Sequence, residues 1–177
     1  LIDRVTHLDP TGGHYQLGKV VGELSIHPDD WFLTCHFTDD HVMPGTLMYE
    51  SCIHTLRVLL MSWGWIGESD AIASMPVPGV AGRLRCRGQV TPETRNVSYE
   101  VHVHEIGYRP EPYVIASALM LADGKPIVEM EGLSLRLAGI DEAQIIKMWA
   151  ATKTSPPASS EKGIPIDAPG GGGDQPP

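Results

Sequence analysis

The sequence predicts an α+β fold, because one long apolar helix precedes a run of strands that can pair in an antiparallel sheet. Residues 46–63 are apolar on nearly every side of a helix, a pattern typical of a helix that is buried all round. Four later segments alternate in character or are rich in β-branched residues, as strands are: residues 82–90, 96–106, 113–121 and 126–137. We therefore expect one sheet that curls around the helix and covers most of its surface.

Start and stop signals flank the long helix. Pro44 and Gly45 stand where it should begin, and a proline suits a first turn because its missing N–H has no partner there. Gly64 and Gly67 follow the last apolar residues, and glycine is typical just after a helix C-terminus. The helix is therefore expected to end at about residue 63.

Three more local patterns predict strands and a turn. Residues 17–26 have β-branched residues and rough alternation, so they are a candidate strand. Residues 31–36 form a short apolar piece after a turn cluster, and we interpret them as a strand that ends at His36. Asp123 and Gly124 give a strong hairpin signal between the last two strands.

The composition excludes some classes of function. With 177 residues and 42% hydrophobic residues, the chain can form one domain with a real core. A net charge of −9 makes nucleic acid and anionic membranes poor partners. The most apolar stretch contains Glu50, His54 and Arg57, whose charges would be costly inside a bilayer. We therefore expect a buried helix and no membrane span.

Cysteine usage and the end of the sequence bear on location and organisation. Cys35, Cys52 and Cys86 show no CxxC spacing, so we predict free buried thiols in a reducing compartment, the cytoplasm. Residues 151–177 are rich in Ser, Pro and Gly and cannot bury enough apolar surface to fold. We expect a folded domain over residues 1–150, followed by a disordered tail or an inter-domain linker. We favour a piece of a longer polypeptide over a short protein with a tail.

Residues 31–50 contain the groups for one particular reaction. His36 precedes a loop, Gly45 lies where the backbone N–H groups of a helix start are free, and Glu50 lies about one turn into the helix. An imidazole base, a buried acid and an N–H donor for an oxyanion are what β-elimination beside a thioester requires. Simpler interpretations exist: His36 as a surface or hydrogen-bonded core residue, and Glu50 paired with His54 four residues along the helix.

The same segment resembles the signature of the FabA/FabZ family of 3-hydroxyacyl-[acyl-carrier-protein] dehydratases. The match consists of Cys35-His36-Phe37, Asp40, Val42-Met43-Pro44-Gly45 and Glu50, fourteen positions after the histidine. The similarity covers about residues 1–137. It includes Asp3-Arg4-Val5, Thr11-Gly12-Gly13, Pro28, Asp29, Trp31, Gly64-Trp65-Ile66-Gly67, Gly88-Gln89-Val90 and Pro92.

The resemblance implies a hot-dog fold and a hydro-lyase that converts a (3R)-hydroxyacyl-[acyl-carrier-protein] to the trans-2-enoyl product. It implies His36 as the base, Glu50 as the acid and the Gly45 amide as the oxyanion donor. Three further residues would orient the ring and the substrate: Val42, Phe37 and Pro44. Of these, the Val42 carbonyl would hold the His36 ring in its working tautomer.

The resemblance also implies the partners. The substrate would arrive on the phosphopantetheine of an acyl carrier protein, with no other cofactor and no metal. The base and the acid of one site would come from two hot dogs, so the domain would form a homodimer or pair with a second hot-dog domain.

Some residues depart from the family pattern. Asp39-Asp40-His41 replaces the usual Gly-Asp-Pro, which removes a rigid element and adds an imidazole. We favour His41 as a surface residue over a sign of a relaxed site. The acid is a glutamate as in FabZ, whereas Trp31-Phe32 and the Gly64–Gly67 segment resemble FabA. Domains of polyunsaturated fatty acid and polyketide-like synthases share this mixture.

Two other patterns have competing interpretations. Arg83, Arg85 and Arg87 should share one face of a strand, either as a landing site for the carrier or its phosphopantetheine phosphate, or as a solvated face. His102 and His104 also share a face, which we interpret as a surface pair on an edge strand and not as a metal site.

Two other functions compete with dehydration. A non-catalytic hot dog could pair with an active dehydratase domain, although the retained His36, Gly45 and Glu50 argue against it. A hot-dog acyl thioesterase would need a carboxylate to activate water, and its product would be a free thiol.

Overall fold

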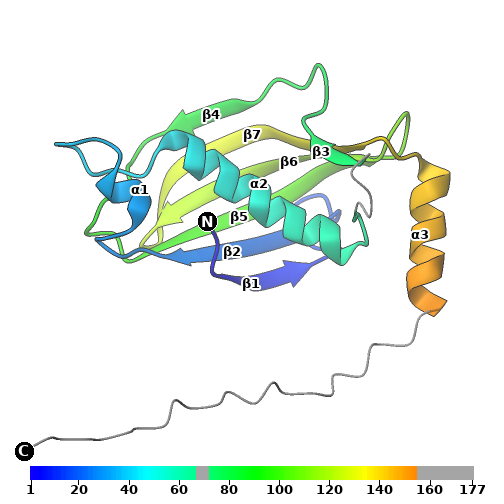
Figure 1. Ribbon diagram of the computed structural model, residues 1–177, viewed down its shortest axis with the longest axis horizontal. Coiled ribbons are helices and arrows are strands. Elements are labelled where there is room, and N and C mark those ends of the chain that lie inside the picture. The colour runs from blue at the N-terminus through cyan, green and yellow to red at the C-terminus, as the bar shows by residue number, and fades with distance from the viewer. Residues whose placement is uncertain (67–71, 155–177) are drawn as a thin grey trace, which may run out of the picture.

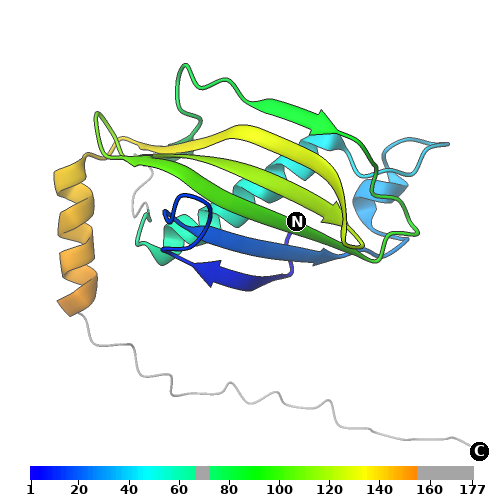
Figure 2. The same ribbon diagram turned by 180° about the vertical axis from the view of Figure 1, so that it is seen from behind.

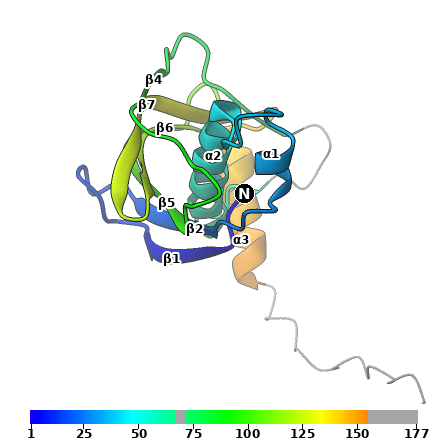
Figure 3. The same ribbon diagram turned by 90° about the vertical axis from the view of Figure 1, so that its left-hand side faces the viewer.

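The computed structural model describes residues 1–66 and 72–154, and its centre is a curved antiparallel sheet around one helix (Figures 1 and 3). The strand order is β1-β2-β5-β6-β7-β3, and β4 also pairs with β7. The strands are β1 (Arg4–Asp9), β2 (Lys19–Ser25), β3 (Ala73–Met75), β4 (Arg83–Cys86), β5 (Asn96–Gly107), β6 (Tyr113–Ala122) and β7 (Lys125–Ala138); the helices are α1 (Trp31–Thr34), α2 (Gly45–Ser62) and α3 (Glu142–Thr154). The predicted α+β class is confirmed.

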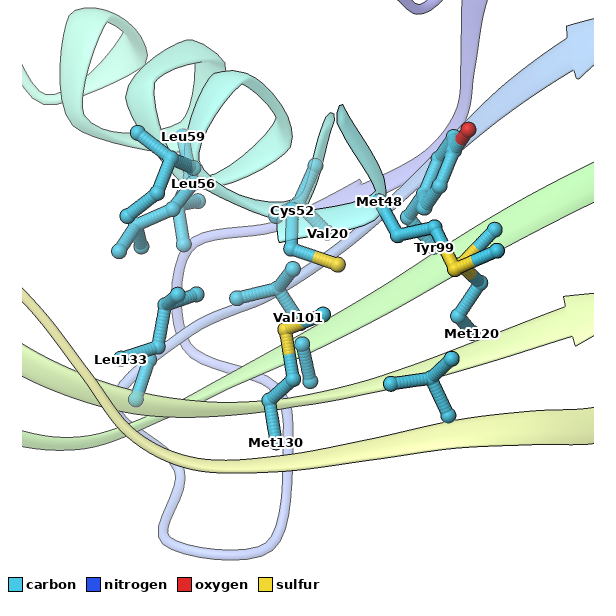
Figure 4. Packing of buried hydrophobic residues seen from close by; sticks show 14 of the residues in the cluster. Val20, Met48, Cys52, Leu56, Leu59, Tyr99, Val101, Met120, Met130 and Leu133 are labelled. Carbon is cyan, nitrogen blue, oxygen red and sulfur yellow. The ribbon is translucent and has the colours of Figure 1, made fainter. Parts of the chain in front are cut away.

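The core lies between the inner face of the sheet and one face of α2. In β5, Val97, Tyr99, Val101 and Val103 are fully buried, as the alternation predicts. Side chains of α2 meet these strands across a close-packed layer (Figure 4). The labelled members of that layer are Val20, Met48, Cys52, Leu56, Leu59, Tyr99, Val101, Met120, Met130 and Leu133.

The expectation that α2 is buried all round is wrong for this chain. Glu50, His54, Arg57 and Met61 form a stripe on the helix side opposite the core, which we call the outer stripe. The side chains of Glu50, His54 and Arg57 are 40%, 38% and 39% exposed, and Met61 is 56% exposed. The reason is that the sheet curves around one side of α2 only.

The hairpin turn and the helix end that the sequence predicts are both present. Asp123 and Gly124 have φ values of 47° and 77°, the combination that a tight hairpin turn requires, and they join β6 to β7. At the end of α2, Gly64 has a φ of 79°, and the Trp65 N–H donates back to the Leu60 carbonyl at 3.0 Å, as is typical of a helix that ends at a glycine. Gly67 lies outside the described residues.

Several elements differ from the predictions. Residues Trp31–Thr34 are a short helix and not a strand, so His36 follows a helix. The strands β1 and β3 and the helix α3 were not predicted. Because α3 ends at Thr154, the first four residues of the predicted tail 151–177 are helical, and residues 155–177 lie outside the described part.

Packing against the rest of the domain explains α3. Ile145 is fully buried, and the Trp149 indole N–H donates to the Gly64 carbonyl at 2.9 Å. The Trp149 ring also contacts Tyr108 edge-on. These partners are distant in sequence, so the local composition of α3 could not indicate that its apolar residues have a surface to pack on.

The cysteine prediction holds in part. All three thiols are free, but only Cys52 is buried, whereas Cys35 and Cys86 are exposed. Burial raises the pKa of the Cys52 thiol to about 12. Within residues 1–66 and 72–154, no helix is both long and apolar enough to cross a membrane.

Candidate active site

The loop that carries His36 is fixed at both ends by buried residues. Before it, Phe32 and Leu33 of α1 are buried in the core. After it, Met43 is buried, and its N–H donates to the Val90 carbonyl at 3.0 Å. Within the loop, the Val42 N–H donates to the His36 carbonyl at 3.2 Å. The loop between α1 and the start of α2 is therefore held in place on both sides of His36 (Figure 1).

The His36 ring is oriented by the backbone. Its Nδ1 lies 3.0 Å from the Val42 carbonyl oxygen. Since a carbonyl can only accept, this hydrogen bond needs the proton on Nδ1 and leaves the lone pair on Nε2. The contact is the one that the family resemblance implies, and a neutral imidazole in this tautomer can accept a proton at Nε2. Phe37, 60% exposed, packs against the ring with centroids 4.0 Å apart.

His41, the departure from the family pattern, is also hydrogen-bonded. Its Nδ1 lies 2.8 Å from the Leu33 carbonyl oxygen at the end of α1. The residue is exposed, as we expected of a surface residue. This bond ties the loop to α1 at the position where the usual proline would stiffen the chain.

Gly45 is the first residue of α2, directly after Pro44. The Pro44 carbonyl accepts the N–H groups of Leu47 and Met48 at 2.9 and 3.1 Å, whereas the Gly45 N–H precedes the first intrahelical bond. A Cβ at Gly45 would meet no atom within 4 Å, so the space beside this amide is open. The helix dipole favours negative charge at this end, so the amide is suited to an oxyanion.

Glu50 projects from the outer stripe of α2. Its Oε1 lies 3.0 Å from His54 Nε2 and 3.6 Å from Arg57 Nη1. The carboxyl is therefore half-exposed and paired, so the expectation of a buried, isolated acid is wrong. The simpler interpretation, pairing with His54, describes this chain correctly, and sequence reasoning missed Arg57, although its spacing of seven residues from Glu50 signals the same helix side.

The candidate base and acid lie on different elements of the chain, the α1–α2 loop and α2. No hydrogen bond or ion pair joins His36 to Glu50 in the described residues, and Glu50 lies on the side of α2 that the sheet leaves open. A cavity of about 140 Å³ lies beside α2, between Tyr49 and strands β4 and β7. Its apolar lining includes Leu84, Met130 and Leu133.

The three predicted carrier-binding arginines have different surroundings. Arg83 pairs with Glu131 at 3.7 Å and Arg85 with Glu129 at 3.8 Å, both across the β4–β7 pair. Arg87 lies just beyond β4, is exposed, and has no ion pair in the described part of the chain. Two of the three charges are thus compensated within the domain, and the carrier role stays a prediction.

The interpretation of His102 and His104 as an edge-strand pair is wrong, because β5 lies between β2 and β6. The β1–β2 loop lies over the outer face of the sheet here, and it stacks His14 on His102 with centroids 4.4 Å apart (Figure 2). His104 Nε2 lies 2.8 Å from Ser117 Oγ. Burial lowers the pKa of both strand histidines, and the charge of His14 lowers both further. The described residues contain no cluster of three metal-ligating side chains.

An antiparallel sheet curled around one helix is a hot-dog fold, and solved structures share it. The dehydratase heterocomplex ApeI:P from Xenorhabdus doucetiae has a TM-score of 0.54 and 14% identity, covering 84% of this chain and 88% of that one. The TT0310 protein from Thermus thermophilus has a TM-score of 0.50 and 12% identity, covering 75% and 89%. The fluoroacetyl-CoA thioesterase FlK has a TM-score of 0.51 and 8% identity, covering 78% and 96%. At such identities these likenesses establish the fold alone.

The sequence comparisons establish the family. Residues 1–131 match the FabA-like domain, so the chain belongs to the FabA-like family, as the motif around His36 and Glu50 indicates. A polyunsaturated fatty acid synthase subunit from Thraustochytrium sp. is 37% identical over 118 residues, which is 66% of this chain. The chain spans only 8% of the length of that relative.

Proposed function

We propose that this domain removes water from a (3R)-hydroxyacyl chain on an acyl carrier protein and yields the trans-2-enoyl thioester. The observation that carries the proposal is the hydrogen bond from His36 Nδ1 to the Val42 carbonyl, which leaves Nε2 free to act as a base. Membership of the FabA-like family and the similarity to a fatty acid synthase subunit support the same chemistry.

The reaction follows from three groups. His36 Nε2 takes the proton from the carbon next to the thioester carbonyl, and the Gly45 N–H stabilises the negative charge that develops on the carbonyl oxygen. Glu50 gives a proton to the β-hydroxyl, the C–O bond breaks, and water leaves as the double bond forms. A proton then returns from His36 to Glu50. No electrons are exchanged, so the reaction as written needs no redox cofactor.

The proposed site requires a second hot-dog domain. His36 lies on the α1–α2 loop and Glu50 on the open side of α2, and both side chains are partly exposed, so each is available to a partner domain. Pairing would place the Glu50 of one domain beside the His36 of the other. The name of the structurally similar ApeI:P complex describes a dehydratase made of two different chains, which makes a non-identical partner as reasonable as a second copy.

The apolar cavity beside α2 gives the acyl chain a place to lie. Tyr49 is the neighbour of Glu50 in sequence and lines this cavity together with Leu84 and Met130. An aliphatic chain bound there would gain from burial of apolar surface. The thioester and its phosphopantetheine would then extend toward the start of α2 and the carrier protein outside.

The test uses purified protein and a 3-hydroxyacyl thioester on carrier protein, followed by mass spectrometry. We expect loss of one water, which His36→Ala and Glu50→Gln reduce by a factor of about 10² to 10⁴. His27→Ala is the control, because it removes an exposed histidine that lies outside the His36 loop and should retain activity.

Other products or no product would contradict the proposal. A free carrier thiol would indicate a thioesterase. No water loss from a folded, paired protein would indicate a non-catalytic hot dog whose active partner is another domain.

A further inference from the structure

The β1–β2 loop, residues 10–18, is folded back over the outer face of the sheet (Figure 2). Two backbone hydrogen bonds hold it there. The Gly18 N–H donates to the Gly12 carbonyl at 2.9 Å, and the Gly18 carbonyl accepts the Val103 N–H of β5 at 3.0 Å. The first bond closes the loop on itself and the second joins it to the sheet, so the two N–H groups report on its closed position.

The loop covers the imidazole ring of His102. The exposed His14 ring stacks on it, with centroids 4.4 Å apart and planes 20° apart. Gly13 lies over the same ring, since a Cβ at Gly13 would be 3.2 Å from His102 Nδ1. This Nδ1 is buried and has no hydrogen-bond partner within residues 1–66 and 72–154, and only 12% of the side chain is exposed. The closed loop therefore keeps one nitrogen of His102 away from water.

The closed position of the loop is compatible with a neutral His102 ring and not with a charged one. A neutral imidazole can present a lone pair at Nδ1, whereas a protonated imidazole carries an N–H on both nitrogens. Under the closed loop, the second N–H would be a buried donor of a charged ring with neither an acceptor nor water beside it, which is unfavourable. Protonation of His102 therefore favours a position of the loop that admits water.

The charged groups around His102 act in the same direction. Glu100 Oε2 lies 3.8 Å from His102 Nε2, but it also pairs with Lys19 Nζ of β2 at 3.3 Å. Burial lowers the pKa of His102, the charges of His14 and Lys19 lower it further, and Glu100 offsets only part of this effect. The neighbouring groups from the loop, β2 and β5 thus favour the neutral ring for as long as the loop is closed.

His104, also on the outer face of β5, provides a comparison. Tyr15 of the loop covers its ring with centroids 4.8 Å apart, and burial lowers its pKa. However, its Nε2 lies 2.8 Å from Ser117 Oγ of β6, and a hydroxyl oxygen can accept from a protonated ring. The Glu131 carboxylate of β7 also acts to raise the pKa of His104. A charged His104 therefore keeps a partner under the closed loop, whereas a charged His102 would have none at Nδ1.

We propose that the β1–β2 loop is a pH-sensitive cover of the outer face of the sheet, closed while the His102 ring is neutral and open once the ring is protonated. The opening also reaches the central helix. At the end of the loop, a Cβ on Gly18 would lie 3.0 Å from Leu59 and 2.8 Å from Trp63 at the C-terminal end of α2. The cover does not depend on the reaction that the domain catalyses.

The experiment measures amide hydrogen exchange by NMR, with each rate divided by the intrinsic rate at the same pH, because protection then reports local opening. Between pH 7.5 and 5.5 we expect protection of the Gly18 and Val103 N–H groups to fall about threefold to tenfold, since a solvated imidazole gains its proton at about pH 6.5. The Asp123 N–H, which donates to the Asn96 carbonyl at 2.9 Å at the other end of β5, should keep its protection.

Three variants assign the opening to one ring. His102→Gln keeps a polar side chain that does not titrate, and its Gly18 protection should be the same at both pH values. His104→Gln is the matched control and should keep the wild-type fall. His14→Gln removes the cation stacked on His102, so the fall should become smaller.

Several results would overturn the proposal. They are constant Gly18 and Val103 protection in the wild type, an equal fall in His102→Gln and the wild type, and a parallel loss at Asp123, which would indicate unfolding of the whole sheet. If His102→Gln does not fold, His14→Gln decides, and an undiminished fall in that variant would exclude the cover.

Discussion

The two sides of α2 differ in the contacts that their side chains make. On the inner side, Cys52, Leu56 and Leu59 are fully buried against the sheet. On the outer stripe, Glu50, His54 and Arg57 contact one another and are half-exposed. Exposed ion pairs contribute only about 0–1 kcal/mol to stability, whereas buried apolar side chains contribute several times more. The inner side therefore maintains the fold, whereas the outer stripe contributes little to its stability.

The largest effect should come from Leu56→Ala on the inner side. Leu56 is fully buried, so its truncation removes apolar contacts and leaves a cavity, at a cost of about 2–5 kcal/mol in the free energy of unfolding. Met61→Ala on the outer stripe should cost less than about 1 kcal/mol in a separated domain. Urea unfolding of both variants measures the difference. Equal losses in the free energy of unfolding would show that both sides of α2 contribute equally to stability.

A smaller effect, on KM for carrier-bound substrate, is expected from the exposed arginines of β4 and of the residues just after it. Arg85→Glu and Arg87→Glu together should raise KM for carrier-bound substrate about threefold to tenfold, because like charges disfavour docking of an acidic carrier. KM for a small 3-hydroxyacyl thioester should not change. Lys147→Glu, on the exposed side of α3, controls for net charge alone. Equal changes in KM for both substrates would exclude a carrier site on these arginines.

The smallest effect concerns the outer face of the sheet and its pH dependence. Burial lowers the pKa of His102 in the folded state, so the unfolded chain binds more protons as the pH falls below about 6.5. Stability that is present above this pH is therefore lost as the pH falls through the lowered pKa. His102→Gln should lose less stability between pH 7.5 and 5.5 in urea unfolding, whereas the exposed His27→Gln should behave as wild type. Identical pH curves for His102→Gln and wild type would contradict this account.

The sequence predicted best those features that depend on neighbours along the chain. The alternation from Val97 to Val103, the turn at Asp123 and Gly124, and the end of α2 at Gly64 are all local, and the structure has each of them. The four residues Trp31–Thr34 are too few for a helical period to show, so their apolar character alone suggests a strand. The helix α3 depends on Trp149 reaching Gly64, which no local pattern encodes.

The sequence motif predicted the His36–Val42 contact but not the surroundings of Glu50, and the catalytic roles stay predictions. The motif placed His36, Gly45 and Glu50, and the implied Val42 contact is present at 3.0 Å. The apolar character of α2 suggested burial on all sides, because a sequence does not say which side of a helix the sheet leaves open. The position of Glu50 on the open side, beside Arg57, needed the structure.

The contact between Trp149 and Gly64 closes a loop of 85 residues across the domain. Such a closure has a large entropic cost, and it can form only after the sheet has brought both ends together. We therefore expect α3 to be the last element to join the domain during synthesis and the first to detach. Since the FabA-like match ends at residue 131, an expression boundary drawn there would omit this closing segment, and one drawn after Thr154 would keep it.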